Sequence, residues 1–63
     1  MKFIDSIKIQ EPGKMIEVYR GSYYETHDRE SWLNDKRFVG IQVEKIKDYA
    51  HDPVIHLKLR EAR

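Results

Sequence analysis

The sequence predicts an α+β fold with a four-stranded antiparallel sheet, built as two hairpins with one short helix between them (ββαββ). Three observations lead to this prediction. Apolar and polar residues alternate in four short segments, a Pro-Gly turn joins the first two segments, and a stretch rich in helix-capping residues precedes the last two. A small open β-barrel is the alternative, because short, twisted strands curl readily. All positions from 1 to 63 are expected to form one small domain.

The first predicted hairpin joins residues 3–10 to residues 15–20 through the turn EPGK. Both segments alternate with a period of two, as strands with one buried face do. Pro12 and Gly13 favour a turn, because proline fixes its own φ and glycine tolerates a positive φ. Folding the chain about this turn sets opposite charges against each other at two places, Lys8 against Glu17 and Asp5 against Arg20.

A helix of about two turns is predicted over residues 27–35. Thr26 and Asp28 are good N-caps, since their side-chain oxygens accept hydrogen bonds from the free N–H groups of a first helical turn. Trp32 and Leu33 then supply an apolar patch that is expected to cover the sheet. We assign Trp32 to the core.

The second predicted hairpin joins residues 37–46 to residues 54–60. Each segment carries three apolar residues at odd positions, so odd positions should face the core and even positions the solvent. The predicted register has four pairs: Val43 opposite Leu57, Ile41 opposite Leu59, Glu44 opposite His56, and Gln42 opposite Lys58.

Composition limits the classes of function. The chain has no cysteine, which excludes disulfides and Cys-based zinc sites. Its 12 Lys and Arg oppose 11 Asp and Glu, so it lacks the basic excess typical of proteins that grip duplex nucleic acid. Neither a membrane span nor a signal peptide is recognisable, and we expect a cytoplasmic protein.

The stretch YYETHDRESW, residues 23–32, contains residue types used by hydrolases, but it is better explained as the start of the helix. His27 and Ser31 are one helical turn apart, yet no oxyanion-binding motif surrounds the serine. His51 and His56 lack the spacing of a closed metal site. We therefore predict no enzyme activity, no metal and no cofactor.

Four tyrosines that the core does not need predict a protein-binding surface: Tyr19, Tyr23, Tyr24 and Tyr49. Tyrosine is enriched at protein interfaces, and open sheet edges invite another chain. The predicted function is that of a small, non-enzymatic regulatory protein that binds another protein, with a homodimer as an open alternative. In its small size and lack of motifs the chain resembles the short accessory proteins of phages and mobile elements, and this resemblance implies that it occupies the surface of a host protein.

The second hypothesis is a module that binds single-stranded nucleic acid through the outer sheet face. Bases would stack on a tyrosine while cationic side chains meet the phosphates. The candidate residues are Lys8, Tyr19, His56, Lys58 and Arg60.

Overall fold

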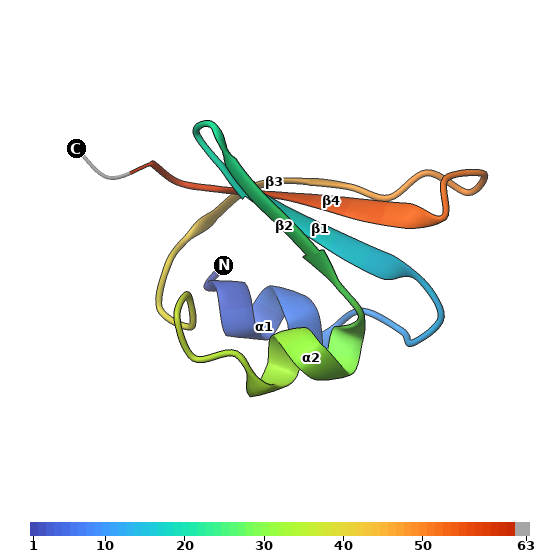
Figure 1. Cartoon of the computed structure of the whole chain (residues 1–63), viewed down its shortest axis with the longest axis horizontal. Coiled ribbons are helices and arrows are strands. Elements are labelled where there is room, and N and C mark those ends of the chain that lie inside the picture. Colours follow the sequence, from blue (N-terminus) through green and yellow to red (C-terminus); the bar gives the residue numbers. More distant parts are fainter. Residues whose placement is uncertain (62–63) are drawn as a thin grey trace.

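The protein adopts an α+β fold, as predicted, in a computed structural model that describes residues 1–61 (Figure 1). The last two positions of the predicted 1–63 domain lie outside the described residues. The elements in chain order are α1 (Phe3–Lys8), β1 (Met15–Arg20), β2 (Tyr23–His27), α2 (Arg29–Asn34), β3 (Val43–Lys47) and β4 (Val54–Leu59).

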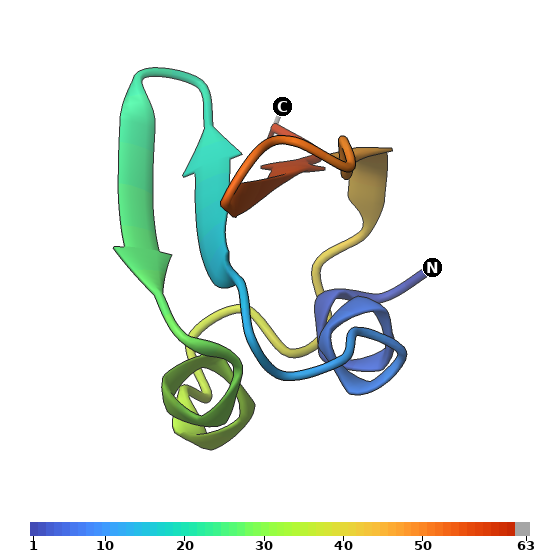
Figure 2. The ribbon, with the colours of Figure 1, turned by 90° about the vertical axis from the view of Figure 1, so that its right-hand side faces the viewer.

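The four strands form one mixed sheet in the order β2-β1-β4-β3. Strands β1 and β2 form one antiparallel hairpin and β3 and β4 form another, with α2 between the hairpins as predicted. The two hairpins meet through parallel pairing of β1 with β4. The prediction of a fully antiparallel sheet is therefore wrong at this central pair. The sheet does not close into a barrel. Both helices lie on one side of it (Figures 1 and 2).

The prediction of a strand at residues 3–10 is wrong, because residues 3–8 form helix α1. Phe3 and Ile7 are four residues apart and both fully buried, a spacing that fits one face of a helix as well as one face of a strand. Ser6 lies between them on the buried side, where its hydroxyl donates to the Phe3 carbonyl at 2.6 Å. Pro12-Gly13 therefore joins a helix to a strand, and the predicted pairs of Lys8 with Glu17 and of Asp5 with Arg20 do not form.

The first hairpin lies further along the chain than predicted. Strand β1, residues 15–20, is confirmed, but its hairpin partner is β2, and the connecting loop is Gly21-Ser22. Gly21 has φ +63°, and a two-residue loop with glycine first is the arrangement of a type II′ turn, whose twist matches that of the strands.

The second hairpin exists, but its first strand starts late. Strand β3 begins at Val43 rather than at residue 37, and Val43 pairs with Leu59 instead of Leu57. Residues 39–43 instead bind the start of the chain: the N–H of Phe3 donates to the Ile41 carbonyl at 2.7 Å. N–H groups in the first turn of a helix have no partner within the helix, and this contact supplies one for α1. The backbone of residues 39–43 is therefore not available for the predicted strand.

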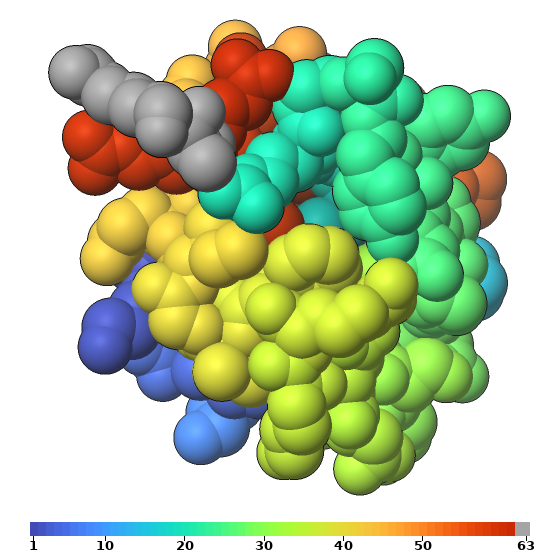
Figure 3. Space-filling view, turned by 60° about the vertical axis from the view of Figure 1, so that its left-hand side comes forward, coloured from blue at the N-terminus to red at the C-terminus, as the bar shows by residue number. Residues whose placement is uncertain are grey.

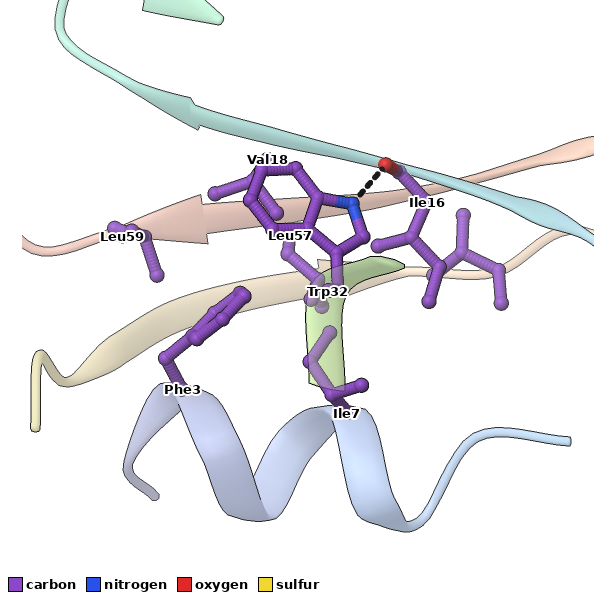
Figure 4. Packing of buried hydrophobic residues seen from close by; sticks show 8 residues of the cluster. Phe3, Ile7, Ile16, Val18, Trp32, Leu57 and Leu59 are labelled. Atoms are coloured by element: carbon purple, nitrogen blue, oxygen red, sulfur yellow. Dashed lines mark hydrogen bonds between the residues drawn. The ribbon is translucent and has the colours of Figure 1, made fainter. Parts of the chain in front are cut away.

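The core lies between the helices and the sheet (Figure 4). The predicted parity of β4 is confirmed, because Ile55, Leu57 and Leu59 are buried while the residues between them are not. The predicted helix is also confirmed, in the shorter form of α2, and Asp28 caps it by accepting from the Ser31 N–H at 2.9 Å.

Trp32 is the largest fully buried side chain, as its assignment to the core predicted. Its indole N–H donates to the Ile16 carbonyl in β1 at 2.7 Å, and its ring meets the Phe3 ring edge-on, with centroids 5.5 Å apart. Trp32 therefore joins α2 to both β1 and α1 (Figure 4).

We predict that Trp32→Phe lowers the free energy of unfolding by about 2 kcal/mol, because it removes a buried hydrogen bond and leaves a cavity. Urea unfolding followed by far-UV circular dichroism measures this. Tyr24→Phe, at an exposed position, should change the value by less than about 0.5 kcal/mol. Equal losses in both variants would contradict the role of Trp32.

Candidate functional site

The side of the sheet opposite the helices is uncovered, and we call it the open face (Figure 2). Side chains that are direct partners on neighbouring strands point to the same side, so the strand register defines two rows across this face. The rows are Tyr24–Tyr19–Lys58–Lys45 and Thr26–Glu17–His56–Lys47, each written from β2 to β3.

Tyrosines form the aromatic part of the open face. Tyr19 and Tyr24 are direct cross-strand partners, and the Tyr24 side chain is 70% exposed. Tyr49 is 59% exposed in the loop before β4, and Lys14 holds this loop by donating to the Tyr49 carbonyl at 2.9 Å. Of the four tyrosines predicted for an interface, the structure thus gathers three around this face.

Two shallow hollows flank Tyr19. One, of about 300 Å³, is lined by Glu17, Tyr19, Lys47, Tyr49 and His56. The other, of about 330 Å³, lies toward the Gly21-Ser22 turn and is also lined by Tyr24. Tyr19 therefore lines both depressions.

His56 lies at the centre of the open face and contacts two carboxylates. Its Nδ1 lies 3.2 Å from Glu17 Oε1 and its Nε2 lies 3.0 Å from Asp52 Oδ2. The predicted partner Glu44 is wrong, since the residue opposite His56 is Lys47. Hydrogen bonds that Asp52 and then Glu17 accept from His56 raise the pKa of His56, because two carboxylates favour the imidazolium, which donates from both nitrogens.

The charges of the open face are nearly balanced. Lys58 pairs with Glu44 at 3.4 Å, while Lys45 and Lys47 form no ion pair within residues 1–61. Three lysines thus face three carboxylates, those of Glu17, Glu44 and Asp52, two of which bind the His56 imidazole. The two unpaired lysines lie on the β3 edge.

Tyr23 lies on the other side of the sheet. Its ring packs on Phe38, with centroids 6.1 Å apart, and its hydroxyl donates to Glu25 at 2.6 Å. Arg37 also binds Glu25, and the two contacts, first that of Tyr23, lower the pKa of Glu25 to about 2. Tyr23 therefore helps to attach the segment between α2 and β3 to the first hairpin. Figure 3 shows that segment, yellow-green to yellow, against the green hairpin.

The predicted nucleic-acid residues are divided between several places. Tyr19, His56 and Lys58 lie on the open face. Lys8 belongs to α1, where its carbonyl accepts from Arg29 at 3.2 Å, and Arg60 follows β4, where its carbonyl accepts from Arg20 at 2.9 Å.

Alternation along the sequence does not identify Lys45 and Lys47 as residues of the open face. Strict alternation from the inward-facing Val43 would turn both toward the core, but a bulge between Val43 and Lys45 reverses the parity of the strand. The segment VEKIK contains no glycine or other residue that predicts a bulge. The bulge is recognised only from the pairing of β3 with β4.

His27 and Ser31 of the stretch YYETHDRESW take structural positions. The His27 ring meets the Trp32 ring edge-on at 4.9 Å, and the Ser31 N–H serves the cap of α2. Within residues 1–61 there is no group of three His, Asp or Glu side chains arranged to hold a metal ion. Nor does the described part of the chain include a helix of the length and apolarity needed to cross a membrane.

Comparisons with protein-family models, with curated proteins and with solved structures find no match for this chain.

We predict that the contacts of His56 make stability depend on pH in a defined direction. Its folded-state pKa is raised, so their contribution is complete below about pH 6.5 and is lost as pH rises through the raised value. The pKa of Asp52 is lowered, chiefly by the Val54 N–H. The contribution of the Asp52 contacts to stability is therefore lost as pH falls below about 3.8.

Urea unfolding at intervals from pH 5 to pH 9 tests this prediction. The free energy of unfolding should fall between pH 6 and pH 9, and His56→Gln should remove most of that fall. A variant with the same slope as the parent protein would show that another group is responsible.

Proposed function

We propose that this protein is a small, non-enzymatic regulatory protein that binds another protein through its open face. The observation that carries the proposal is the uncovered side of the sheet, on which Tyr19 and Tyr24 are direct partners and Tyr49 borders the same hollow as Tyr19. Tyrosines supply large contact area at interfaces and lose little conformational freedom on binding.

The charges on the open face support a protein partner. A site for a polyanion usually carries a clear cationic excess, whereas this face sets three carboxylates among its cations. Protein interfaces combine buried aromatic anchors with a mixed polar rim. The two unpaired lysines favour a partner that offers carboxylates beside an aromatic or apolar group, with the carboxylates over the β3 side and the apolar group over Tyr19.

The chemistry of His56 supports a binding role over catalysis. Both of its ring nitrogens face carboxylates of the chain itself, so neither is free to exchange a proton with a bound substrate. A cytoplasmic location, and a role like that of the phage and mobile-element accessory proteins that occupy a host protein's surface, belong to the same proposal.

We predict that Tyr24→Ser and the double variant Lys45→Glu/Lys47→Glu each weaken binding of the partner at least tenfold. The partner would be isolated on immobilised protein, purified, and then titrated with each variant. The matched controls are Ile9→Ser, which removes an apolar side chain of similar exposure just after the end of α1, and Lys36→Glu, which reverses an exposed charge before β3.

Both controls should bind like the parent protein, and all variants should keep its circular dichroism spectrum. Losses of equal size in controls and open-face variants would overturn the proposal. So would full binding by both open-face variants.

Single-stranded nucleic acid is the second candidate ligand. One observation favours it: the row Tyr24–Tyr19–Lys58–Lys45 crosses all four strands, so stacking rings and cations follow one line.

We predict that a 20-nucleotide oligothymidylate binds only weakly, because the carboxylates of Glu17 and Glu44 oppose its phosphates. Fluorescence anisotropy at low salt tests this. Tight binding that falls steeply with added salt and is lost in Lys45→Glu/Lys47→Glu would favour nucleic acid over protein as the ligand.

A further inference from the structure

The two edges of the sheet differ in how they meet solvent. Strand β3 at one edge carries a bulge and two lysines, which discourage another strand from pairing there. Strand β2 at the other edge has the sequence YYETH, with no bulge in its pairing to β1 and no proline, glycine or lysine. Figure 2 shows β2 as the outermost strand beside β1, so its far edge is accessible.

The backbone groups at this accessible edge belong to Tyr24 and Thr26. In a two-residue hairpin the residues that flank the loop, here Arg20 and Tyr23, exchange hydrogen bonds, and bonded pairs then alternate along the ladder. Tyr23, Glu25 and His27 therefore bind β1, and the residues between them point their N–H and C=O groups outward. Within residues 1–61 no hydrogen bond reaches those outward groups.

We propose that β2 pairs antiparallel with β2 of a second copy of this chain, about a two-fold axis at Thr26. In this register Thr26 faces its own counterpart, and Glu25 of each copy faces His27 of the other. Opposed threonines stabilise antiparallel pairs, and an imidazole N–H of His27 can donate to the opposed Glu25 carboxylate. A register shifted by one residue toward the turn would instead set Glu25 against Glu25, which is unfavourable.

The side chains at this position suit such pairing. The carboxylate of Glu25 uses Oε2 for Tyr23 and Arg37, while Oε1 is 3.2 Å from His27 of its own chain. Glu25 and His27 are both partly exposed, so a second copy would extend this contact into an alternating group of two acidic residues and two histidines.

This dimer goes beyond the proposed function and does not depend on it. A two-fold axis through paired edge strands is perpendicular to the sheet, so both open faces end on the same side of one eight-stranded sheet. The exposed tyrosines of the two copies would then border one joined surface. An interface made chiefly by one pair of short strands is small, so the association should be weak and dependent on concentration.

A single-cysteine scan tests the register, since the chain contains no cysteine of its own. Thr26→Cys should form a disulfide across the axis, because directly opposed residues have Cα atoms about 4.5–5.5 Å apart and disulfides span about 4.4–6.8 Å. Tyr24→Cys should not, since its two copies would be offset by four residues, about 13 Å. Lys36→Cys, in the loop before β3, measures random collision.

The expected result is that mild oxidation links Thr26→Cys at least tenfold faster than the other two variants, as seen on non-reducing gels. Sedimentation of the parent protein should show a mass that rises with concentration. Thr26→Lys should suppress this rise, whereas Asn34→Lys, at an exposed position of α2, should not.

Three results would overturn the dimer. One is faster linkage at position 24 than at position 26. The second is linkage at position 26 no faster than at position 36 although circular dichroism shows Thr26→Cys to be folded. The third is a parent protein that stays monomeric at every concentration, which is the result expected if the β2 edge pairs with a strand of another protein.

Discussion

The parallel pairing of β1 with β4 is the contact on which the rest of the molecule depends. It joins segments about forty residues apart and turns two separate hairpins into one sheet. It also aligns Ile16 with Ile55 and Val18 with Leu57, so one side of the joined sheet is continuously apolar. An isolated two-stranded hairpin is at best marginally stable in water, whereas four strands with one apolar face can be covered by helices. Trp32 reinforces this joint, because its indole binds the Ile16 carbonyl from the helix side.

The fully buried apolar side chains of this short chain all lie between the helices and one side of the four-stranded sheet. Phe3 and Ile7 of α1 and Trp32 of α2 fill the covered side, and Phe38 packs against them from the loop that follows. The opposite side carries tyrosines and charged side chains, some of them paired. Chains of this size bury on folding only about 60% of the total surface of the unfolded chain, so an uncovered face is an expected consequence of length.

The His56 contacts connect fold and surface. Glu17 and His56 are register partners on the two parallel strands, and Asp52 reaches His56 from the turn that precedes β4. The group that lies at the centre of the open face therefore also bridges the two hairpins. A change at the surface that weakens these bonds would therefore weaken the central strand pair and lower the stability of the sheet.

The sequence by itself determined the α+β class, the strands at 15–20 and 54–59, the capped helix after Asp28, and the burial of Trp32 and of the odd positions of β4. These features are local, because caps act within one turn and alternation shows directly in a strand with one buried face. Only the tertiary structure decided the helix at Phe3–Lys8, the bulge in β3 and the parallel joint of β1 with β4. The apolar spacing of Phe3 and Ile7 suits both a helix and a strand, and the backbone of residues 39–43 becomes a partner for α1 only after the chain has folded. Long-range backbone pairing depends on which groups meet in space, and residue types along the chain do not encode that directly.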